Sequence, residues 1–192
     1  IAHIFPPLGG SGVQRTLKFV KYLREFNWKP VVITSGESKY PIKDYSLISE
    51  IPQEVKIKRI DENYTMNNEI LNEIVNIYSG IIKNNKILNQ YVSQLEENPQ
   101  NIDYFIRIPD IFILWANQVI KKMNGIMSNN FDLIYSTSGP YSDHIIGYHL
   151  KKKYSLPWVA DFRDEWTNNP YANYSRGSLR YQMNYLLEKE VV

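Results

Sequence analysis

The chain has 192 residues, of which 43% are hydrophobic and none is cysteine, and its 22 Lys and Arg exceed its 20 Asp and Glu by a net charge of +2. A chain of this length and composition can bury one core of domain size. The lack of cysteine excludes disulfide scaffolds, thiolate catalysis and cysteine-bound metals, and the small net charge gives no support to a nucleic-acid partner.

The two ends of the sequence suggest that it is part of a longer protein. The chain opens without a methionine inside an apolar run, and it closes at Val192 without a helix-stop signal. No apolar run approaches the roughly 20 residues of a membrane span, and the first residues do not resemble a signal peptide. We therefore expect one domain, residues 1–192, with more chain beyond it.

The first predicted feature is a strand-to-helix turn with the sequence FPPLGGSGVQR, residues 5–15. The apolar residues 1–4 predict a strand, which Pro6 and Pro7 end because proline cannot donate a ladder hydrogen bond. Apolar residues at helical spacing then predict a helix over about 11–26. The glycines of this turn allow a ligand to approach the backbone closely.

The glycine-rich turn is suited to bind an anion. The first N–H groups of a helix have no intrahelical partner and carry a partial positive charge, so a phosphate can bind there. The plainer alternative is a tight turn that needs a positive φ at one glycine. A P-loop is excluded because its motif is absent, and a dinucleotide fingerprint fits poorly because Arg15 stands at the position of the third glycine.

The remaining elements alternate between strands and helices. Strands are predicted at 30–34, 55–60, 131–135 and 157–160, with a loop over 37–54; helices are predicted at 66–97, broken near Gly80 or near Asn84 and Asn85, at 110–127, at 140–154 with Pro140 in its first turn, and at 179–192. A strand–helix–strand unit of this kind is right-handed and belongs to a parallel sheet. The pattern predicts a single α/β domain.

Three polar clusters follow predicted strands: GGSG at 9–12, STSGP at 136–140 and DFRDEW at 161–166. The carboxyl ends of parallel strands lie along one edge of a sheet, so we expect the three clusters to converge there. They would offer backbone donors for a phosphate, hydroxyls for a polyol, and carboxylates beside a guanidinium that can orient hydroxyls and stabilise charge. The combination predicts a site for a phosphorylated ligand that is rich in hydroxyls.

Each cluster also has a purely structural interpretation. Ser138 could cap the following helix, Asp161 and Asp164 could cap the next segment or pair with Arg163, and Trp166 could be a core residue. His144 could reach the site as a proton donor or sugar ligand, or it could be solvated or packed. His144 and His149 are five residues apart and do not share a helix face, so no metal site is predicted.

The segments FPPLGGSGVQR, DLIYSTSGPYSDHIIGYHLKKKY and LPWVADFRDEWT, in this order, resemble the N-terminal domain of family 4 retaining glycosyltransferases. The resemblance implies a Rossmann-like three-layer sandwich with a mainly parallel sheet, which is the acceptor-side half of a GT-B architecture. It also implies a C-terminal nucleotide-sugar domain beyond Val192, and an isolated N-terminal domain that is inactive.

The resemblance implies transfer of a sugar from a nucleotide-diphosphate sugar, the co-substrate, to a saccharide or lipid-linked acceptor, without a cofactor or metal. This chain has Ser136, Thr137 and Ser138 where many family members have a histidine near the reacting sugar. The predicted site residues are Gly9, Gly10, Ser11 and Gly12 for the donor phosphates; Ser136, Thr137, Ser138, Tyr141, Asp161 and Arg15 for the acceptor; and Asp164, Arg163 and His144 for catalysis.

Two other functions stay open on the sequence. The first is a non-catalytic α/β ligand-binding or interaction domain, in which the three clusters are only turns. The second is a nicotinamide-dependent oxidoreductase, with Gly10 and Gly12 at the cofactor and Glu37 as a ribose ligand. The resemblance favours a cytoplasmic protein, with peripheral contact to the inner face of a membrane as an option.

Overall fold

The computed structural model describes residues 1–36, 40–62, 67–83, 85–97, 106–126, 131–172 and 174–192. Within these residues the fold is α/β, with two parallel sheets of two strands each. Strand β1 (Val31–Ser35) pairs with β2 (Lys56–Ile60), and β3 (Ile134–Thr137) pairs with β4 (Trp158–Asp161). The parallel pairing predicted from the strand–helix–strand order is confirmed for both sheets.

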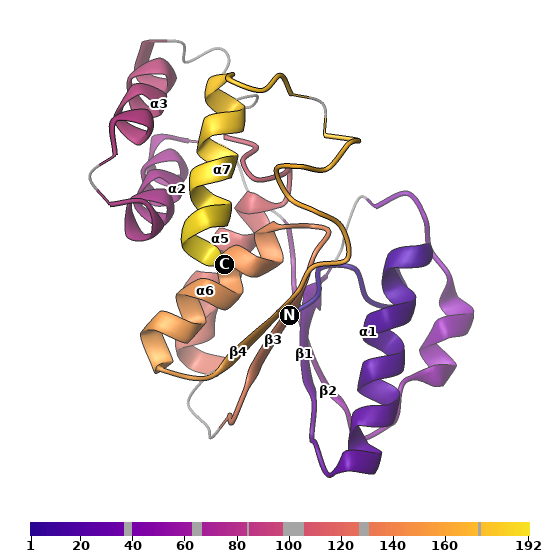
Figure 1. Cartoon of the computed structure of the whole chain (residues 1–192). Coiled ribbons are helices and arrows are strands. Elements are labelled where there is room, and N and C mark those ends of the chain that lie inside the picture. Colours follow the sequence, from indigo (N-terminus) through magenta and orange to yellow (C-terminus); the bar gives the residue numbers. More distant parts are fainter. Residues whose placement is uncertain (37–39, 63–66, 84, 98–105, 127–130, 173) are drawn as a thin grey trace.

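Helices account for most of the remaining structure (Figure 1). They are α1 (Ser11–Tyr22), which continues as the 3-10 helix η1 (Leu23–Phe26), η2 (Tyr45–Glu50), α2 (Asn68–Ile81), α3 (Lys86–Glu97), α5 (Ile113–Ile126), α6 (Ser142–Tyr154) and α7 (Leu179–Val191). Helix α1 lies on one side of the strands, whereas α5 and α6 lie on the other side, and α7 lies beside α2 and α3 (Figure 1).

The start of the chain lies between the two sheets. The Ala2 N–H donates to Ile33 O of β1 at 3.0 Å, the Ser35 N–H donates to His3 O at 3.4 Å, and the Ile1 nitrogen donates to Tyr135 O of β3 at 2.6 Å. The predicted strand over 1–4 is therefore not a regular strand, because this short run makes only two backbone bonds to β1 and one to β3. It nevertheless bridges the sheets.

Most predicted elements are confirmed, with shifted boundaries. Strand β3 begins at Ile134 rather than at Phe131, because Ile134 is the residue in register with Trp158 at the start of β4. Helix α6 begins at Ser142 rather than at Pro140, and the Ser142 N–H is capped by the Asp110 carboxylate at 3.0 Å. The predicted loop over 37–54 contains η2, whose start is capped by Asp44.

The predicted helix over 66–97 forms two helices, since α2 ends at Ile81 and α3 begins at Lys86. This outcome agrees with the asparagine alternative rather than with Gly80, which lies inside α2. Met66, Asn84 and Met127, which belong to predicted helices or breaks, lie outside the described residues.

The apolar core consists of two clusters of unequal size. The larger cluster joins α2, α3, α5, α6 and α7, and it contains the fully buried Trp115 and Trp166. The smaller cluster packs Val13, Leu17 and Val20 of α1 against Phe5 and Val32. An apolar helix stripe that faces a strand in this way is the arrangement that the helical spacing in α1 predicts.

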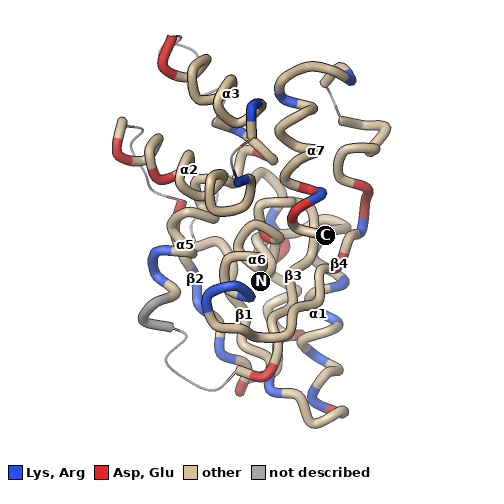
Figure 2. The backbone as a smooth tube through the Cα atoms, turned by 60° about the vertical axis from the view of Figure 1, so that its left-hand side comes forward, with Lys and Arg blue, Asp and Glu red and all other residues tan. Residues whose placement is uncertain are grey.

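Charged residues of both signs are distributed over the chain (Figure 2). Basic positions lie along α1 and β2. Acidic side chains pair with cations of α1 and η1: Glu50 with Lys18 and Lys21, Asp161 with Arg15, and Glu54 with Arg24 of η1. In the described part of the chain, no helix has both the length and the apolarity that crossing a membrane requires.

Candidate functional site

Asp161, the last residue of β4, organises one side of the candidate site. Its carboxylate accepts hydrogen bonds from Tyr135 Oη at 2.7 Å and Thr137 Oγ1 at 2.8 Å, and it pairs with Arg15 Nη1 at 2.6 Å. Burial opposes ionisation, but these two hydrogen bonds and the nearby Arg15 charge outweigh it and lower the pKa of Asp161. A residue of α1 and two residues of β3 are thus joined to the end of β4.

Arg163 joins all three polar clusters. Its Nη1 donates to Gly12 O at 2.9 Å, its Nη2 donates to Gly139 O at 2.6 Å, and its Nε donates to Ser138 O. The backbone N–H of Arg163 also donates to Ser138 Oγ at 3.2 Å. The predicted convergence of the three clusters is therefore confirmed. The guanidinium donates to three backbone carbonyls, so in this structure it holds the glycine-rich turn and the loop after β3 together.

The structure decides between two interpretations of Ser138. Its hydroxyl accepts from the Arg163 backbone, and its own N–H donates to Asp161 O at 2.9 Å. Tyr141 is the N-cap of α6, and no side chain of that residue caps the helix. Ser138 is therefore a link between the second and third clusters, and the alternative that it caps the helix is wrong.

The glycine-rich turn has a fixed backbone. Gly10 takes a φ of +90° at the N-cap of α1, as the tight-turn alternative requires, and the Gly9 N–H donates to Ile42 O at 2.9 Å. A Cβ on Gly12 would meet Arg163 Nη1 at 2.8 Å, so a glycine is needed for the clamp. Gly10 and Ser11 are exposed. No side chain caps the start of α1, so side chains leave its first N–H groups unpaired, as an anion site there would require.

His144 is packed in the interior rather than exposed at the site. Its Nδ1 lies 2.8 Å from Ser136 Oγ, which also accepts from Trp158 Nε1 at 2.9 Å. Its ring centroid lies 4.2 Å from that of Phe162. Burial lowers the pKa of His144 to about 3, so the ring is neutral at physiological pH. Of the alternatives that the sequence left open for His144, the structure shows the packed one.

Tyr141 and the third cluster form the outer part of the site. Tyr141 donates to Glu165 O and stacks on Trp166, with ring centroids 5.1 Å apart. Trp166 is buried and donates to Asn184 Oδ1 at 2.8 Å, so its interpretation as a core residue is confirmed. Asp164, which belongs to the same cluster, is exposed. Asp164 is thus a carboxylate that a ligand can reach.

A buried polar network behind the site was not predicted. The His3 N–H donates to Asp143 Oδ2 at 2.9 Å, and His3 Nε2 lies 2.6 Å from Glu62 Oε1, which also accepts from Ser35 Oγ. Burial raises the pKa of Asp143 to about 7. Local sequence contains no signal for this network, because its bonds join residues 59 and 140 positions apart.

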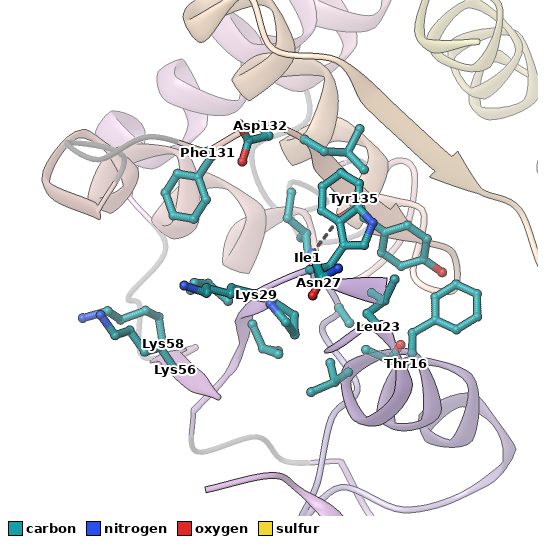
Figure 3. A pocket seen from close by; sticks show the side chains of 18 residues that line it. Ile1, Thr16, Leu23, Asn27, Lys29, Lys56, Lys58, Phe131, Asp132 and Tyr135 are labelled. Atoms are coloured by element: carbon teal, nitrogen blue, oxygen red, sulfur yellow. Dashed lines mark hydrogen bonds between the residues drawn. The ribbon is translucent and has the colours of Figure 1, made fainter. Parts of the chain in front are cut away.

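A cavity lies at the opposite end of the strands. It has a volume of about 620 Å³, and residues at the start of β1, β2 and β3 line it together with α1 (Figure 3). Lys29, Lys56 and Lys58 stand at one side of this cavity (Figure 3). None of the predicted site residues lines it.

Within the described ranges, no group of three His, Asp or Glu side chains is arranged to hold a metal ion. Comparisons with protein families, curated proteins and solved structures find none to which the chain is similar at a significant level. A functional proposal therefore depends on the sequence motifs and on the carboxyl edge, the side of the strands where the three polar clusters meet. Arg163 and Asp161 are its two organising side chains.

Proposed function

We propose that the chain is the acceptor-side domain of a retaining glycosyltransferase that uses a nucleotide-diphosphate sugar. The observation that carries this proposal is the Arg163 clamp, which joins Gly12, Ser138 and Gly139. These residues belong to the three segments whose sequences resemble family 4 glycosyltransferases. Segments that would share one ligand in that family are in contact in this chain.

The proposed architecture is a Rossmann-like three-layer domain, the N-terminal half of a GT-B enzyme. In this proposal the two sheets are parts of one mainly parallel sheet, with residues 1–3 between β1 and β3. The bonds from Ala2 to Ile33 and from Ile1 to Tyr135 support this arrangement, as does the position of α1 opposite α5 and α6 (Figure 1). Ligands of such sheets bind outside the carboxyl ends of the strands.

Each part of the proposed site has a separate role. The N–H groups at the start of α1 would contact the donor diphosphate, next to the exposed Gly10 and Ser11. The exposed Asp164 would orient an acceptor hydroxyl, and Asp161 would keep Arg15 and Thr137 in place. A second domain would supply the remaining donor contacts, so the isolated chain would be inactive.

The direct test is a screen of the complete protein against a panel of nucleotide sugars, with NMR detection of the anomeric configuration of the product. We expect transfer with retention. Asp164→Asn is expected to reduce kcat/KM about 100-fold, since hydrogen bonds that orient reactants contribute at this scale. Asp132→Asn, at the opposite end of the strands, is the matched control and should not change kcat/KM.

Failure to turn over or bind any nucleotide sugar would contradict the proposal and favour the non-catalytic ligand-binding alternative. The oxidoreductase alternative is tested by titration with the reduced nicotinamide cofactor. Its predicted ribose ligand, Glu37, lies outside the described residues. Saturable binding of that cofactor, together with no binding of nucleotide sugars, would establish the third function instead.

A further inference from the structure

The loop between β4 and α7 is long and has an unusual composition. It spans residues 162–178, and the structure assigns no helix or strand to 162–172 and 174–178. A loop of this length inside a compact domain is usually a binding loop. Its sequence contains tyrosine, asparagine, serine and glycine but no Val, Leu, Ile or Met. The same residue types are enriched in antibody binding loops, because tyrosine supplies rigid contact area and asparagine and serine supply adaptable hydrogen bonds.

Aromatic rings form a row that begins at the candidate site and continues along α7. Tyr141 stacks on Trp166, and Tyr174 Oη donates to Trp166 O at 3.3 Å. The ring centroids of Tyr174 and Tyr181 are 6.1 Å apart. Those of Tyr181 and Tyr185 are 6.4 Å apart, and the planes of these two rings differ by 15°. We call Tyr174, Tyr181 and Tyr185 the tyrosine row.

A ligand can reach the tyrosine row from solvent. Tyr185 is 50% exposed, whereas Tyr174 and Tyr181 are partly buried. The hydrogen bond from Tyr174 to Trp166 holds the first ring in place, so binding a ligand costs little further side-chain entropy there. Asn168 is exposed in the same loop. The row is thus a preformed aromatic surface next to a loop with polar side chains.

The charges of the loop favour an uncharged ligand. Its two arginines, Arg163 and Arg176, balance Asp164 and Glu165, so residues 162–178 carry no net charge. A nucleic acid or a phosphorylated ligand is bound by a surface with an excess of positive charge. The loop also lacks the aliphatic side chains that would pack against an acyl chain.

A saccharide has the chemistry that the tyrosine row can bind. One face of a pyranose ring presents C–H groups with a partial positive charge, and the face of an aromatic ring is negative. The hydroxyls at the edge of the sugar can bond to amide and hydroxyl side chains. Tyr181 and Tyr185 are nearly parallel and one helix turn apart, so they can contact successive units of an extended chain.

We propose that the tyrosine row binds an uncharged oligosaccharide along the units that lie beyond its reacting end. The acceptor hydroxyl would lie at Asp164, and the chain would continue past Tyr174 toward Tyr185. The position at Asp164 rests on the proposed function, whereas the row depends only on its own geometry and chemistry. The proposal selects an extended saccharide, rather than a lipid, as the group that this surface recognises.

The test measures how the affinity of the complete protein depends on saccharide length. The probes are malto-, cello- and chito-oligosaccharides of one to six units, titrated by calorimetry without a nucleotide sugar. Tyr185→Ala removes the exposed ring, and Tyr185→Phe keeps it. Tyr22→Ala is the matched control, because Tyr22 of α1 is 47% exposed and lies outside the row.

We expect the affinity in at least one series to rise with the number of units. Tyr185→Ala should weaken binding of the longest member about 2-fold to 10-fold, since one aromatic contact contributes at this scale, and should not change binding of the monosaccharide. Tyr185→Phe and Tyr22→Ala should bind like the wild type. If Tyr185→Ala lowers the thermal midpoint, Tyr185→Leu gives the same comparison with the volume kept. Affinity that rises with length in no series, or equal binding by Tyr185→Ala and Tyr22→Ala, would overturn the proposal.

Three further outcomes separate the tyrosine row from a membrane surface and from the proposed function. Binding to dioleoylphosphatidylglycerol vesicles that is lost in Tyr185→Ala, without saccharide binding, would assign the row to a membrane and overturn the proposal. Saccharide binding that depends on length and on Tyr185, without transfer from any nucleotide sugar, would support the row and contradict the proposed function. Transfer from a nucleotide sugar, with no effect of acceptor length on binding, would support the proposed function and overturn the row.

Discussion

The two ends of the parallel strands are built on different physical principles. At the carboxyl edge, Arg163 and Asp161 bind polar groups from three loops, and their partners lie 24 to 151 residues away in sequence. At the amino edge, a cavity of about 620 Å³ is lined largely by apolar residues of α1 and β1, with Lys29, Lys56 and Lys58 at one side. Hydrogen bonds hold the carboxyl edge together, whereas a cavity lies at the amino edge.

This difference shows why cavity volume alone does not identify the site. A ligand site needs a few polar groups in fixed positions, and these are found where Arg163 and Asp161 hold the loops. The cavity instead is lined largely by apolar residues, and its charged groups stand at one side. The two ends should therefore respond differently to substitution, pH and salt.

Arg163→Ala is expected to have the largest effect on the carboxyl edge. It leaves the carbonyls of Gly12, Ser138 and Gly139 without a charged donor, and hydrogen bonds to charged groups contribute about 1.5–3 kcal/mol each without being additive. We expect the free energy of unfolding to fall by about 3 kcal/mol, as measured by urea denaturation. A loss as small as that of Arg176→Ala, an exposed arginine, would show that the clamp does not hold the loops.

The sequence was sufficient to predict the elements and the convergence of the clusters, but not the bonds within them. Apolar periodicity identifies α1, and the polar residues after each strand indicate the shared edge. It could not show that Arg163 would bind carbonyls rather than a carboxylate, because that choice depends on the distance between loops far apart in sequence. The sequence offered the packed position of His144 as one of several alternatives and could not choose it, since its ring neighbours Trp158 and Phe162 lie elsewhere in the chain.

The buried network around His3 and Asp143 is a second feature that local sequence could not predict. A carboxylate in the first turn of a helix is ordinarily interpreted as a favourable charge at the N-terminus. Here its burial depends on the chain start that passes beside it, and the His3 N–H becomes its partner. Pairings between residues 140 positions apart follow from the fold and not from local spacing.

The smallest expected effect distinguishes the ion pair of Asp161 with Arg15 from its hydrogen bonds with Tyr135 and Thr137. Arg15→Ala removes a pair whose arginine side chain is 45% exposed, so it should cost about 0.5 kcal/mol or less and vary with salt. Asp161→Asn also weakens the bonds from Tyr135 and Thr137 and should cost about 1 kcal/mol.

The folded pKa of Asp161 is lowered, so its contribution to stability is present above the ordinary pKa of an aspartate and is lost as the pH falls further. Urea denaturation at pH 7 and at pH 3 should therefore show a smaller difference between wild type and Asp161→Asn at the lower pH. If Arg15→Ala costs more than Asp161→Asn, the exposed ion pair rather than the hydroxyl bonds fixes the end of β4.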